Sequence, residues 1–309
     1  MTGKWRRKAG GNSLALAFPL LPSIFPLSWA MAFPLDSQYM VETPPVVLTI
    51  AGFDPSSGAG ITADIKTIAA NGCYGIAGIT SLTVQSSSGV KLVVPSDSNL
   101  LRETLEELAG DIEISAVHVG MLGSGRIASC VADFLAEAKL PYLVLDPILE
   151  SSSGASLLDE SGIDVMKKRL LPLATVVTPN VDEATALTGV EVLDLEGMER
   201  AARRLHEMGA GAVVVTGGHL EQAVDLLSVQ GEQKVFRADR VASKHTHGTG
   251  CAFSAAIACH LAWGRPLSTA VLLAKAYVTS AIRYGYAVGR GTGPVNHMFQ
   301  NKNPRNGEE

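Results

Sequence analysis

Short apolar runs alternate with segments of helical periodicity along most of this chain, and this alternation limits the fold more than any other feature. Near-continuous apolar runs rich in β-branched residues are typical of strands buried on both faces of a sheet. Such strands are expected at 46–51, 76–83, 91–94, 116–119, 142–145, 175–178 and 212–215. Helices are expected at 61–70, 99–108, 126–138, 165–171, from about 180, at 198–208, after 250 and at about 267–284. The order predicts an α/β fold with a mostly parallel central sheet and helices on both faces.

A β-hairpin is expected late in the chain, where two strand-like runs (224–229 and 234–237) flank Gln230 and Gly231. Of the 309 residues, 47% are apolar and 18% are charged, which indicates a globular protein with an ample core. We expect one folded domain over residues 45–298 and a polar tail over 299–309.

Residues 1–44 differ in composition from the rest and are expected to be a non-folding or targeting-like extension. A basic start precedes an apolar stretch (14–27) that three prolines interrupt, and Ala30-Met31-Ala32 resembles a signal cleavage site. A membrane anchor fits the length, but we favour an untranslated or non-folding extension, with Met31 or Met40 as later starts.

Charge and cysteine usage narrow the class of partner. The first forty residues carry +3, which leaves −8 for the remainder of a chain whose total is −5, and this argues against a nucleic-acid partner. The four cysteines form no C-x-x-C pair, as expected of free thiols in a reducing compartment. We therefore expect a cytoplasmic protein without a membrane partner.

A glycine turn near the C-terminus is the strongest candidate for a phosphate site. Gly248, Thr249 and Gly250 precede Cys251 and an alanine-rich apolar run. Glycine tolerates the positive φ of a tight turn, and the first amides of a helix lack intrahelical partners. The turn therefore predicts an anion-binding nest at a helix N-terminus. The alternative is an ordinary glycine turn before a buried helix.

Of two other nucleotide-binding motifs, one is incomplete in this chain and the other is absent. Residues 58–63 fit the G-x-G-x-x-A variant of the dinucleotide fingerprint, but residues 79–82 supply no acidic side chain for the ribose. The chain also contains no G-x-x-x-x-G-K-[ST] phosphate loop. A dehydrogenase and a Walker-type ATPase are therefore disfavoured.

Seven motifs in order resemble a known family. They are 49–66 (Thr-Ile-Ala-Gly-Phe-Asp-Pro-Ser-Ser-Gly-Ala-Gly-Ile-Thr-Ala-Asp-Ile-Lys), 119–122 (Val-Gly-Met-Leu), 145–147 (Leu-Asp-Pro), 178–183 (Thr-Pro-Asn-x-x-Glu), 217–219 (Gly-Gly-His), 246–254 (Thr-His-Gly-Thr-Gly-Cys-Ala-Phe-Ser) and 293–295 (Gly-Pro-Val). Together they resemble the hydroxymethylpyrimidine/phosphomethylpyrimidine kinases of thiamine biosynthesis, in the ribokinase superfamily. The resemblance covers about residues 46–297 and implies a ribokinase-like fold, ATP and Mg²⁺ as cofactors, and a homodimer.

The resemblance places Gly52, Asp64, Gln85 and Met121 in the pyrimidine pocket. An aminopyrimidine presents a donor beside a ring acceptor, which a carboxylate and an amide can satisfy. Without the resemblance, Asp64 reads as a solvated helix residue, Gln85 as a turn residue and Met121 as core filling.

The resemblance also implies that Asn180 and Glu183 organise Mg²⁺ and the nucleotide phosphates through water, with Asp146 and Thr216 beside the phosphates. Residues at i and i+3 share a helix face, and Mg²⁺ prefers oxygen ligands while retaining waters. Asn180 is equally a plausible N-cap.

Cys251 is the expected catalytic base in a site formed with Gly248, Thr249 and Gly250. Related kinases carry aspartate at this position, whereas the resembled family carries cysteine. A thiol at a helix N-terminus has a lowered pKa, so we expect the pKa of Cys251 to fall toward neutrality. The alternative is a small buried hydrophobic residue.

Two positions depart from the commonest family pattern. Thr216 stands where many members have lysine, and a Ser151–Ser153 run stands where Lys-Ser-Gly is frequent, with Ser152 in the lysine's place. We expect weaker phosphate electrostatics but an active enzyme. His118, His219 and His247 are interpreted as structural or loop residues.

Two other functions remain open. A pyridoxal or pyridoxine kinase would perform the same chemistry on another flat heteroaromatic alcohol. A non-catalytic pyrimidine-binding protein is a more distant alternative, which the complete glycine nest opposes.

Overall fold

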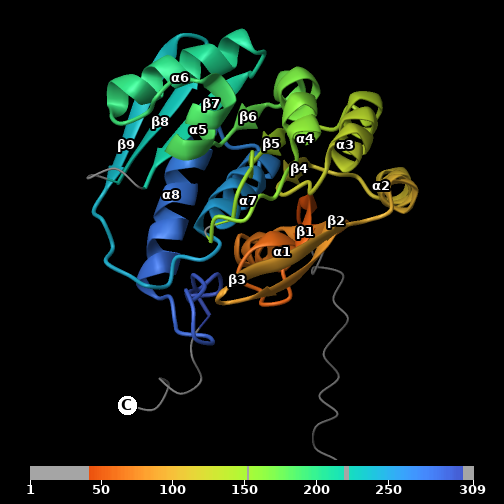
Figure 1. Ribbon diagram of the computed structural model, residues 1–309, viewed down its shortest axis with the longest axis horizontal. Helices are drawn as coiled ribbons and strands as arrows, with labels where there is room; N and C mark the ends of the chain where they lie inside the picture. Colours follow the sequence, from red (N-terminus) through yellow and green to blue (C-terminus); the bar gives the residue numbers. More distant parts are fainter. Residues whose placement is uncertain (1–41, 152, 219–222, 302–309) are drawn as a thin grey trace, which may run out of the picture. The chain divides into compact units, whose positions relative to one another are not determined.

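A sheet of nine strands organises the part of the chain that the computed structural model describes, residues 42–151, 153–218 and 223–301 (Figure 1). Most of the expected extension (1–44), most of the expected tail (299–309), Ser152 and His219 lie outside these residues, so those predictions stay predictions. The described residues from 43 onward group as one compact unit.

The strand order is β3-β2-β1-β4-β5-β6-β7-β8-β9. The strands are β1 (Val46–Phe53), β2 (Tyr74–Ser86), β3 (Gly89–Pro95), β4 (Ala116–Val119), β5 (Leu143–Leu145), β6 (Val176–Val177), β7 (Ala212–Gly217), β8 (Ala223–Val229) and β9 (Glu232–Ala238). Strands β2, β1, β4, β5, β6 and β7 are parallel, whereas β3, β8 and β9 add antiparallel edges. The predicted mostly parallel sheet and the late hairpin are confirmed.

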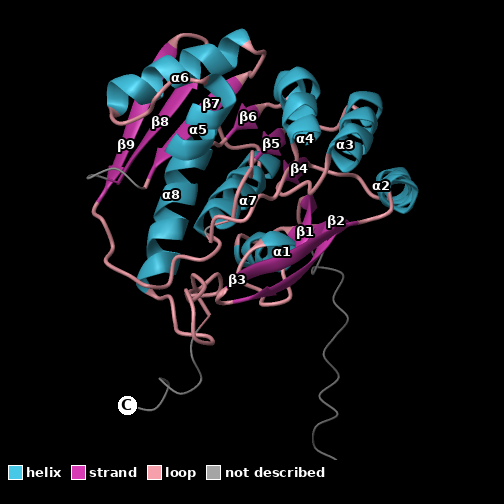
Figure 2. Ribbon diagram, in the orientation of Figure 1, coloured by secondary structure: helices cyan, strands magenta, loops and turns pink. Residues whose placement is uncertain are grey.

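Helices cover both faces of this sheet (Figure 2). They are α1 (Gly60–Ala70), α2 (Ser98–Asp111), α3 (Gly125–Ala138), α4 (Glu160–Val165), α5 (Val181–Thr188), α6 (Leu195–Glu207), α7 (Thr249–Ala262) and α8 (Leu267–Arg283). Strand residues alternate between two cores: Leu48 and Ile50 of β1 pack with α2–α6, while Val47 packs with α1, α7 and α8. Because both faces are buried, the strands read as continuous apolar runs.

Two sequence expectations differ from the structure. The helix expected at 165–171 is instead the end of α4, followed by a π segment (Met166–Leu170) and a 3₁₀ turn (Leu171–Leu173). Gln85, read as a turn residue without the family resemblance, lies in β2, which pairs with β3 as a long antiparallel hairpin. No helix in the described ranges is long and apolar enough to cross a bilayer.

The topology indicates that a ligand would bind at the carboxyl edge of the sheet. The chain order reverses at β1, which has β2 on one side and β4 on the other. Open α/β sheets bind ligands outside the carboxyl ends of their strands at such a reversal. The segments that follow β1, β4, β5 and β6 all begin at this edge.

Candidate active site

One cavity of about 1110 Å³ lies at this edge, bounded by the strand-end loops and the start of α7. All twelve site residues proposed from the sequence line it: Gly52, Asp64, Gln85, Met121, Asp146, Asn180, Glu183, Thr216, Gly248, Thr249, Gly250 and Cys251. Small-molecule pockets commonly have volumes of about 300–1,000 Å³. This cavity is therefore large enough for an acceptor and a nucleotide together.

The glycine turn caps α7 through its backbone. Gly248 is the N-cap residue in a left-handed conformation (φ 84°), and no side chain caps the helix. The first amides of a helix have no intrahelical acceptor, and the helix dipole favours an anion there. The turn therefore leaves donors facing the cavity, as an anion-binding nest requires.

The turn also contacts the glycine loop that follows β1. A Cβ on Gly248 would lie 1.9 Å from the Gly58 carbonyl oxygen, and a Cβ on Gly58 would lie 2.1 Å from His247 Cδ2. Neither position has room for a side chain. This contact fixes the phosphate nest against the loop that begins the expected acceptor pocket.

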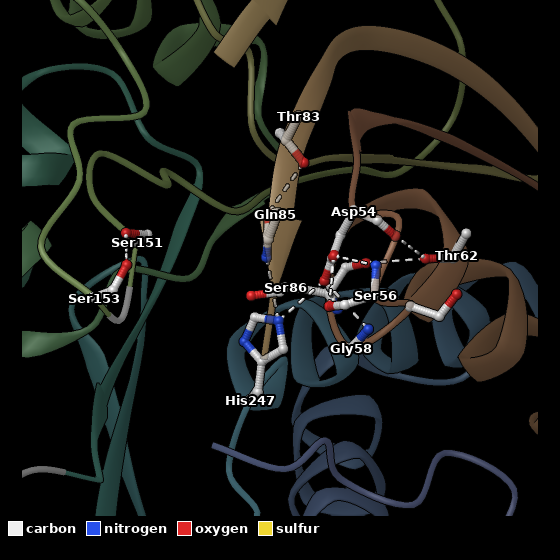
Figure 3. Close-up of polar contacts among 12 residues, drawn as sticks. Asp54, Ser56, Gly58, Thr62, Thr83, Gln85, Ser86, Ser151, Ser153 and His247 are labelled. Atoms are coloured by element: carbon white, nitrogen blue, oxygen red, sulfur yellow. Dashed lines mark hydrogen bonds and ion pairs between the residues drawn. The ribbon is translucent and has the colours of Figure 1, made fainter. Parts of the chain in front are cut away.

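A buried aspartate holds the loop together, as Figure 3 shows. Asp54 accepts hydrogen bonds from the amides of Ser56 (2.8 Å) and Ala59 (3.0 Å), and its Oδ2 lies 3.0 Å from His247 Nε2. Burial pushes the pKa of Asp54 upward, but the hydrogen bonds from His247 and Ser56 outweigh it, so the pKa lies below its usual value. The sequence reasoning missed Asp54, although an aspartate two residues before a serine in a glycine-rich turn is an Asx-turn signal.

His247 continues this cluster toward β2. Its Nε2 lies 3.4 Å from Gln85 Nε2, and Gln85 Oε1 lies 3.2 Å from the Thr83 hydroxyl (Figure 3). His247 therefore touches both the loop and an expected pyrimidine contact, which its interpretation as a structural residue did not anticipate.

The other residues expected in the acceptor pocket, Gly52, Met121 and Asp64, are packed against their neighbours. A Cβ on Gly52 would lie 2.8 Å from Met121 Sδ, so these two residues are in direct contact. Asp64 is fully buried: its Oδ2 accepts from the Thr49 hydroxyl (2.7 Å), while its Oδ1 has no partner. Asp64 on α1 is therefore buried. The alternative from the sequence alone, a solvated helix residue, is wrong.

Asn180 and Glu183 form a capping box at the start of α5. Asn180 Oδ1 accepts from the amides of Asp182 and Glu183 (2.9 Å each), and Glu183 Oε2 accepts from the Asn180 amide (2.9 Å). The N-cap reading of Asn180 is confirmed. Glu183 Oε1 and the side-chain nitrogen Nδ2 of Asn180 are not used by the box.

Two carboxylates repel each other beside this helix start. Burial, and then the nearby charge of Asp146, raises the pKa of Glu183 to about 8. Burial also raises the pKa of Asp146 to about 6, although His118 and Ser254 oppose this. Thr216 lies alongside, because its amide donates to the Pro179 carbonyl (2.9 Å).

These residues fit a hydrated Mg²⁺ better than a metal held by protein ligands alone. Within the described ranges no three His, Cys, Asp or Glu residues are grouped closely enough to hold a metal. Two repelling, buried carboxylates nevertheless favour a divalent cation, and Mg²⁺ commonly keeps several waters.

Cys251 lies in the cavity wall and is 9% exposed. Burial and the charges of Asp146 and Asp64 raise the pKa of its thiol well above the ordinary value. The expected fall toward neutrality is therefore wrong for the unliganded protein. A helix N-terminus contributes about 0.3–2 kcal/mol, whereas burial shifts a pKa by as much as about 3–5 units, so burial prevails.

A cation lies close to the uncharged Thr216. Thr216 pairs with Asp225 of β8, and Asp225 Oδ2 binds Lys275 Nζ of α8 at 2.6 Å. Both charged side chains are buried and line the cavity. The sequence reasoning gave no role to this ion pair, because its members are fifty residues apart.

The cavity, the glycine nest and the sheet define a ribokinase-like α/β kinase. The phosphomethylpyrimidine kinase family model matches residues 54–296. The chain is 42% identical over 257 residues to the hydroxymethylpyrimidine/phosphomethylpyrimidine kinase of Haemophilus influenzae, covering 81% of this chain and 96% of that protein. It therefore belongs to the phosphomethylpyrimidine kinase family.

Two further relatives bear on substrate and architecture. The chain is 44% identical over 255 residues to the bifunctional thiamine biosynthesis protein ThiED of Geobacter sulfurreducens; the match covers 82% of this chain but spans about half (52%) of that protein's length. Among solved structures, the pyridoxal kinase of Staphylococcus aureus in complex with AMP-PCP and pyridoxal superposes with a TM-score of 0.77 at 32% identity, covering 84% of this chain and 96% of that one.

Proposed function

We propose that this protein uses ATP to phosphorylate 4-amino-5-hydroxymethyl-2-methylpyrimidine and then its monophosphate, as a step in thiamine biosynthesis. The observation that carries the proposal is one continuous cavity, whose wall contains both the expected pyrimidine contacts and the glycine nest. Membership in the phosphomethylpyrimidine kinase family supports the same acceptor.

In this proposal, Gln85, Gly52 and Met121 contact the pyrimidine, with Asp64 beneath them. The Gly248–Cys251 turn binds the phosphoryl group that moves, and Asp146, Asn180, Glu183 and Thr216 lie beside the nucleotide phosphates. Mg²⁺, held through waters near Asn180 and Glu183, would neutralise phosphate charge. Cys251 accepts the alcohol proton only if bound ligands lower the pKa of its thiol.

Steady-state kinetics with three acceptors tests this function. Purified protein is incubated with Mg-ATP and either the hydroxymethylpyrimidine, its monophosphate or pyridoxal, and ADP release is followed. We expect the highest kcat/KM for the two pyrimidines. A higher kcat/KM for pyridoxal would assign the protein as a pyridoxal kinase, which the superposition with the Staphylococcus aureus enzyme favours.

Binding without turnover would give a third result. If the pyrimidine binds in calorimetry but no acceptor yields ADP above the ATP-only control, the protein is a non-catalytic pyrimidine-binding protein. Mass spectrometry of the product distinguishes the monophosphate from the diphosphate and so tests the second phosphorylation separately.

We also propose a homodimer that forms through the β2–β3 hairpin. Leu82, Val84, Leu92 and Val94 are 47–54% exposed, and Leu82 pairs with Val94 as Val84 pairs with Leu92. A contiguous apolar face next to an edge strand suits a two-fold contact with a second copy. Light scattering after gel filtration should give twice the chain mass, and Val84→Lys should give a monomer.

A cytoplasmic location is part of the proposal. Its support is the four free thiols, Cys73, Cys130, Cys251 and Cys259. Cell fractionation with mass determination of the mature N-terminus tests it, because an exported protein would be cleaved near residues 30–32 and would lack the segment before the cut.

A further inference from the structure

A chain of five buried polar side chains runs beneath the cavity, joining the expected acceptor pocket to the phosphate nest. Thr49, Asp64 and His118 are fully buried, and Ser254 and Asp146 are 1% and 4% exposed. They come from β1, α1, β4, α7 and the end of β5. The proposed reaction gives no role to His118 or Ser254, yet His118 lies at the centre of the chain.

Both ring nitrogens of His118 meet oxygen atoms. Nδ1 lies 3.2 Å from Thr49 Oγ1 and 3.4 Å from Asp64 Oδ2, and Nε2 lies 2.9 Å from Ser254 Oγ. On the far side, Ser254 Oγ lies 3.1 Å from Asp146 Oδ2. The ring therefore connects two carboxylates, one directly and one through a serine.

The hydrogen-bond partners of the ring favour a hydrogen on both of its nitrogens. Thr49 uses its single hydroxyl hydrogen on Asp64 (2.7 Å), so Thr49 Oγ1 accepts from His118 Nδ1. Apart from the ring, every partner of Ser254 Oγ is an acceptor: Asp146 Oδ2, the Gly250 carbonyl (3.0 Å) and the Cys251 carbonyl (3.1 Å). Once Ser254 donates to one of these, Nε2 also donates. An imidazole that donates from both nitrogens is a cation.

We propose that His118 is a positioning residue: a buried imidazolium that neutralises Asp64 and, through Ser254, orients Asp146 beside the phosphate nest. Breaking a buried charge pair by removing one partner is strongly unfavourable, because the remaining charge is left uncompensated. Without the cation, two buried carboxylates would lie near each other with no positive charge between them. His118 thereby keeps the acceptor side and the phosphate side of the cavity in a fixed relation.

The charges around the ring are consistent with this role. Burial lowers the pKa of His118, but the charge of Asp64 and then that of Asp146 raise it, and the net pKa lies above the ordinary value. The groups that face the ring are Thr49, Asp64 and Ser254, with Asp146 one hydrogen bond further.

A set of substitutions separates a charge role from simple packing. His118→Gln keeps hydrogen-bonding groups but removes the charge, and His118→Lys restores a cation. His206→Gln is the matched control, because both ring nitrogens of His206 are also hydrogen-bonded, to the Ala210 carbonyl (2.9 Å) and to Ser228 Oγ (3.0 Å). Neither of these partners is a carboxylate. We expect a loss of at least about 50-fold in kcat/KM for His118→Gln, recovery to within about tenfold of wild type for His118→Lys, and little change for His206→Gln.

Ser254→Ala distinguishes an effect on turnover (kcat) from an effect on pyrimidine binding (KM). It removes the hydroxyl that joins His118 to Asp146 and leaves the ring's contacts with Thr49 and Asp64, so we expect kcat to fall while the KM for the pyrimidine changes less than about twofold. Equal losses for His118→Gln and His118→Lys, with kcat and KM changing together in Ser254→Ala, would show a packing role and overturn the inference.

The kinetic part of this test rests on the proposed function, so a readout without turnover accompanies it. ¹⁵N-histidine NMR of the unliganded protein at pH 7.5 reports the protonation of each ring nitrogen, and the signals of His118 are assigned by their loss in His118→Gln. Two protonated nitrogens support the inference even if no acceptor is phosphorylated, and one unprotonated nitrogen overturns it even in an active kinase.

Discussion

Replacing Glu183 by glutamine should make the unliganded protein less sensitive to high pH. The pKa of Glu183 rises from 4.5 to about 8 in the folded protein, because the side chain is buried beside Asp146. The folded state therefore binds a proton that the unfolded state has released between these two values. The stabilisation that this bound proton contributes is fully present below pH 4.5 and is lost as the pH rises toward 8. The effect is opposite in sign to that of a salt-bridged carboxylate.

The size of the effect follows from the pKa values. One pKa unit corresponds to about 1.4 kcal/mol. The charge of Asp146 contributes to the raised pKa of Glu183, and the pKa of Asp146 itself changes on folding, so only part of the full difference belongs to Glu183, and we expect about 2–4 kcal/mol. Glutamine can still accept the Asn180 amide in the capping box, so Glu183→Gln removes the charge and keeps the helix cap.

Urea unfolding at pH 5 and pH 8.5, with EDTA and without nucleotide, measures this effect. We expect Glu183→Gln to gain about 2–4 kcal/mol over wild type between the two pH values. Glu160→Gln, which changes an exposed glutamate in the first turn of α4, is the control and should follow wild type. Parallel pH profiles for wild type and Glu183→Gln would refute the reasoning. Mg²⁺ at pH 8.5 should stabilise wild type more than the variant.

Three further outcomes are expected. Cys251→Ala should slow the first phosphorylation far more than the second, because a phosphate acceptor with a second pKa near about 6 needs no base; equal losses would favour a positioning role. Gly248→Ala should lower kcat by about 100-fold, since its Cβ would meet the Gly58 oxygen, whereas Gly189→Ala, also at positive φ (74°) but in open space, should not. Leu105→Ala, in the core, should lose about 2–5 kcal/mol in urea unfolding.

The sequence predicted the parts of the fold that depend on local pattern. Strands buried on both faces, such as Ala116–Val119, and amphipathic helices, such as Gly125–Ala138, appear where apolar spacing placed them. The π segment at Met166–Leu170 did not, because apolar spacing does not distinguish i→i+5 from i→i+4 hydrogen bonding.

The sequence predicted which residues lie together at the cavity, but it did not predict their ionisation. All twelve residues line the cavity, because carboxyl ends of parallel strands converge on one edge. The predicted direction of the Cys251 pKa was wrong, because that pKa depends first on burial and then on the charges of Asp146 and Asp64, which lie far away in sequence. His118 was interpreted as structural for the same reason: its partners are 69 and 136 residues away.

The position of α7 determines which side of the cavity adapts to substrate. Residues 251–261 of this helix are buried all around, between the sheet, α1 and α8. A helix enclosed in this way cannot slide or rotate without separating its neighbours. The glycine turn at its end is thus held in place by the buried helix and by its close contact with the loop after β1, so we expect acceptors of different length to be accommodated at the β2–β3 hairpin.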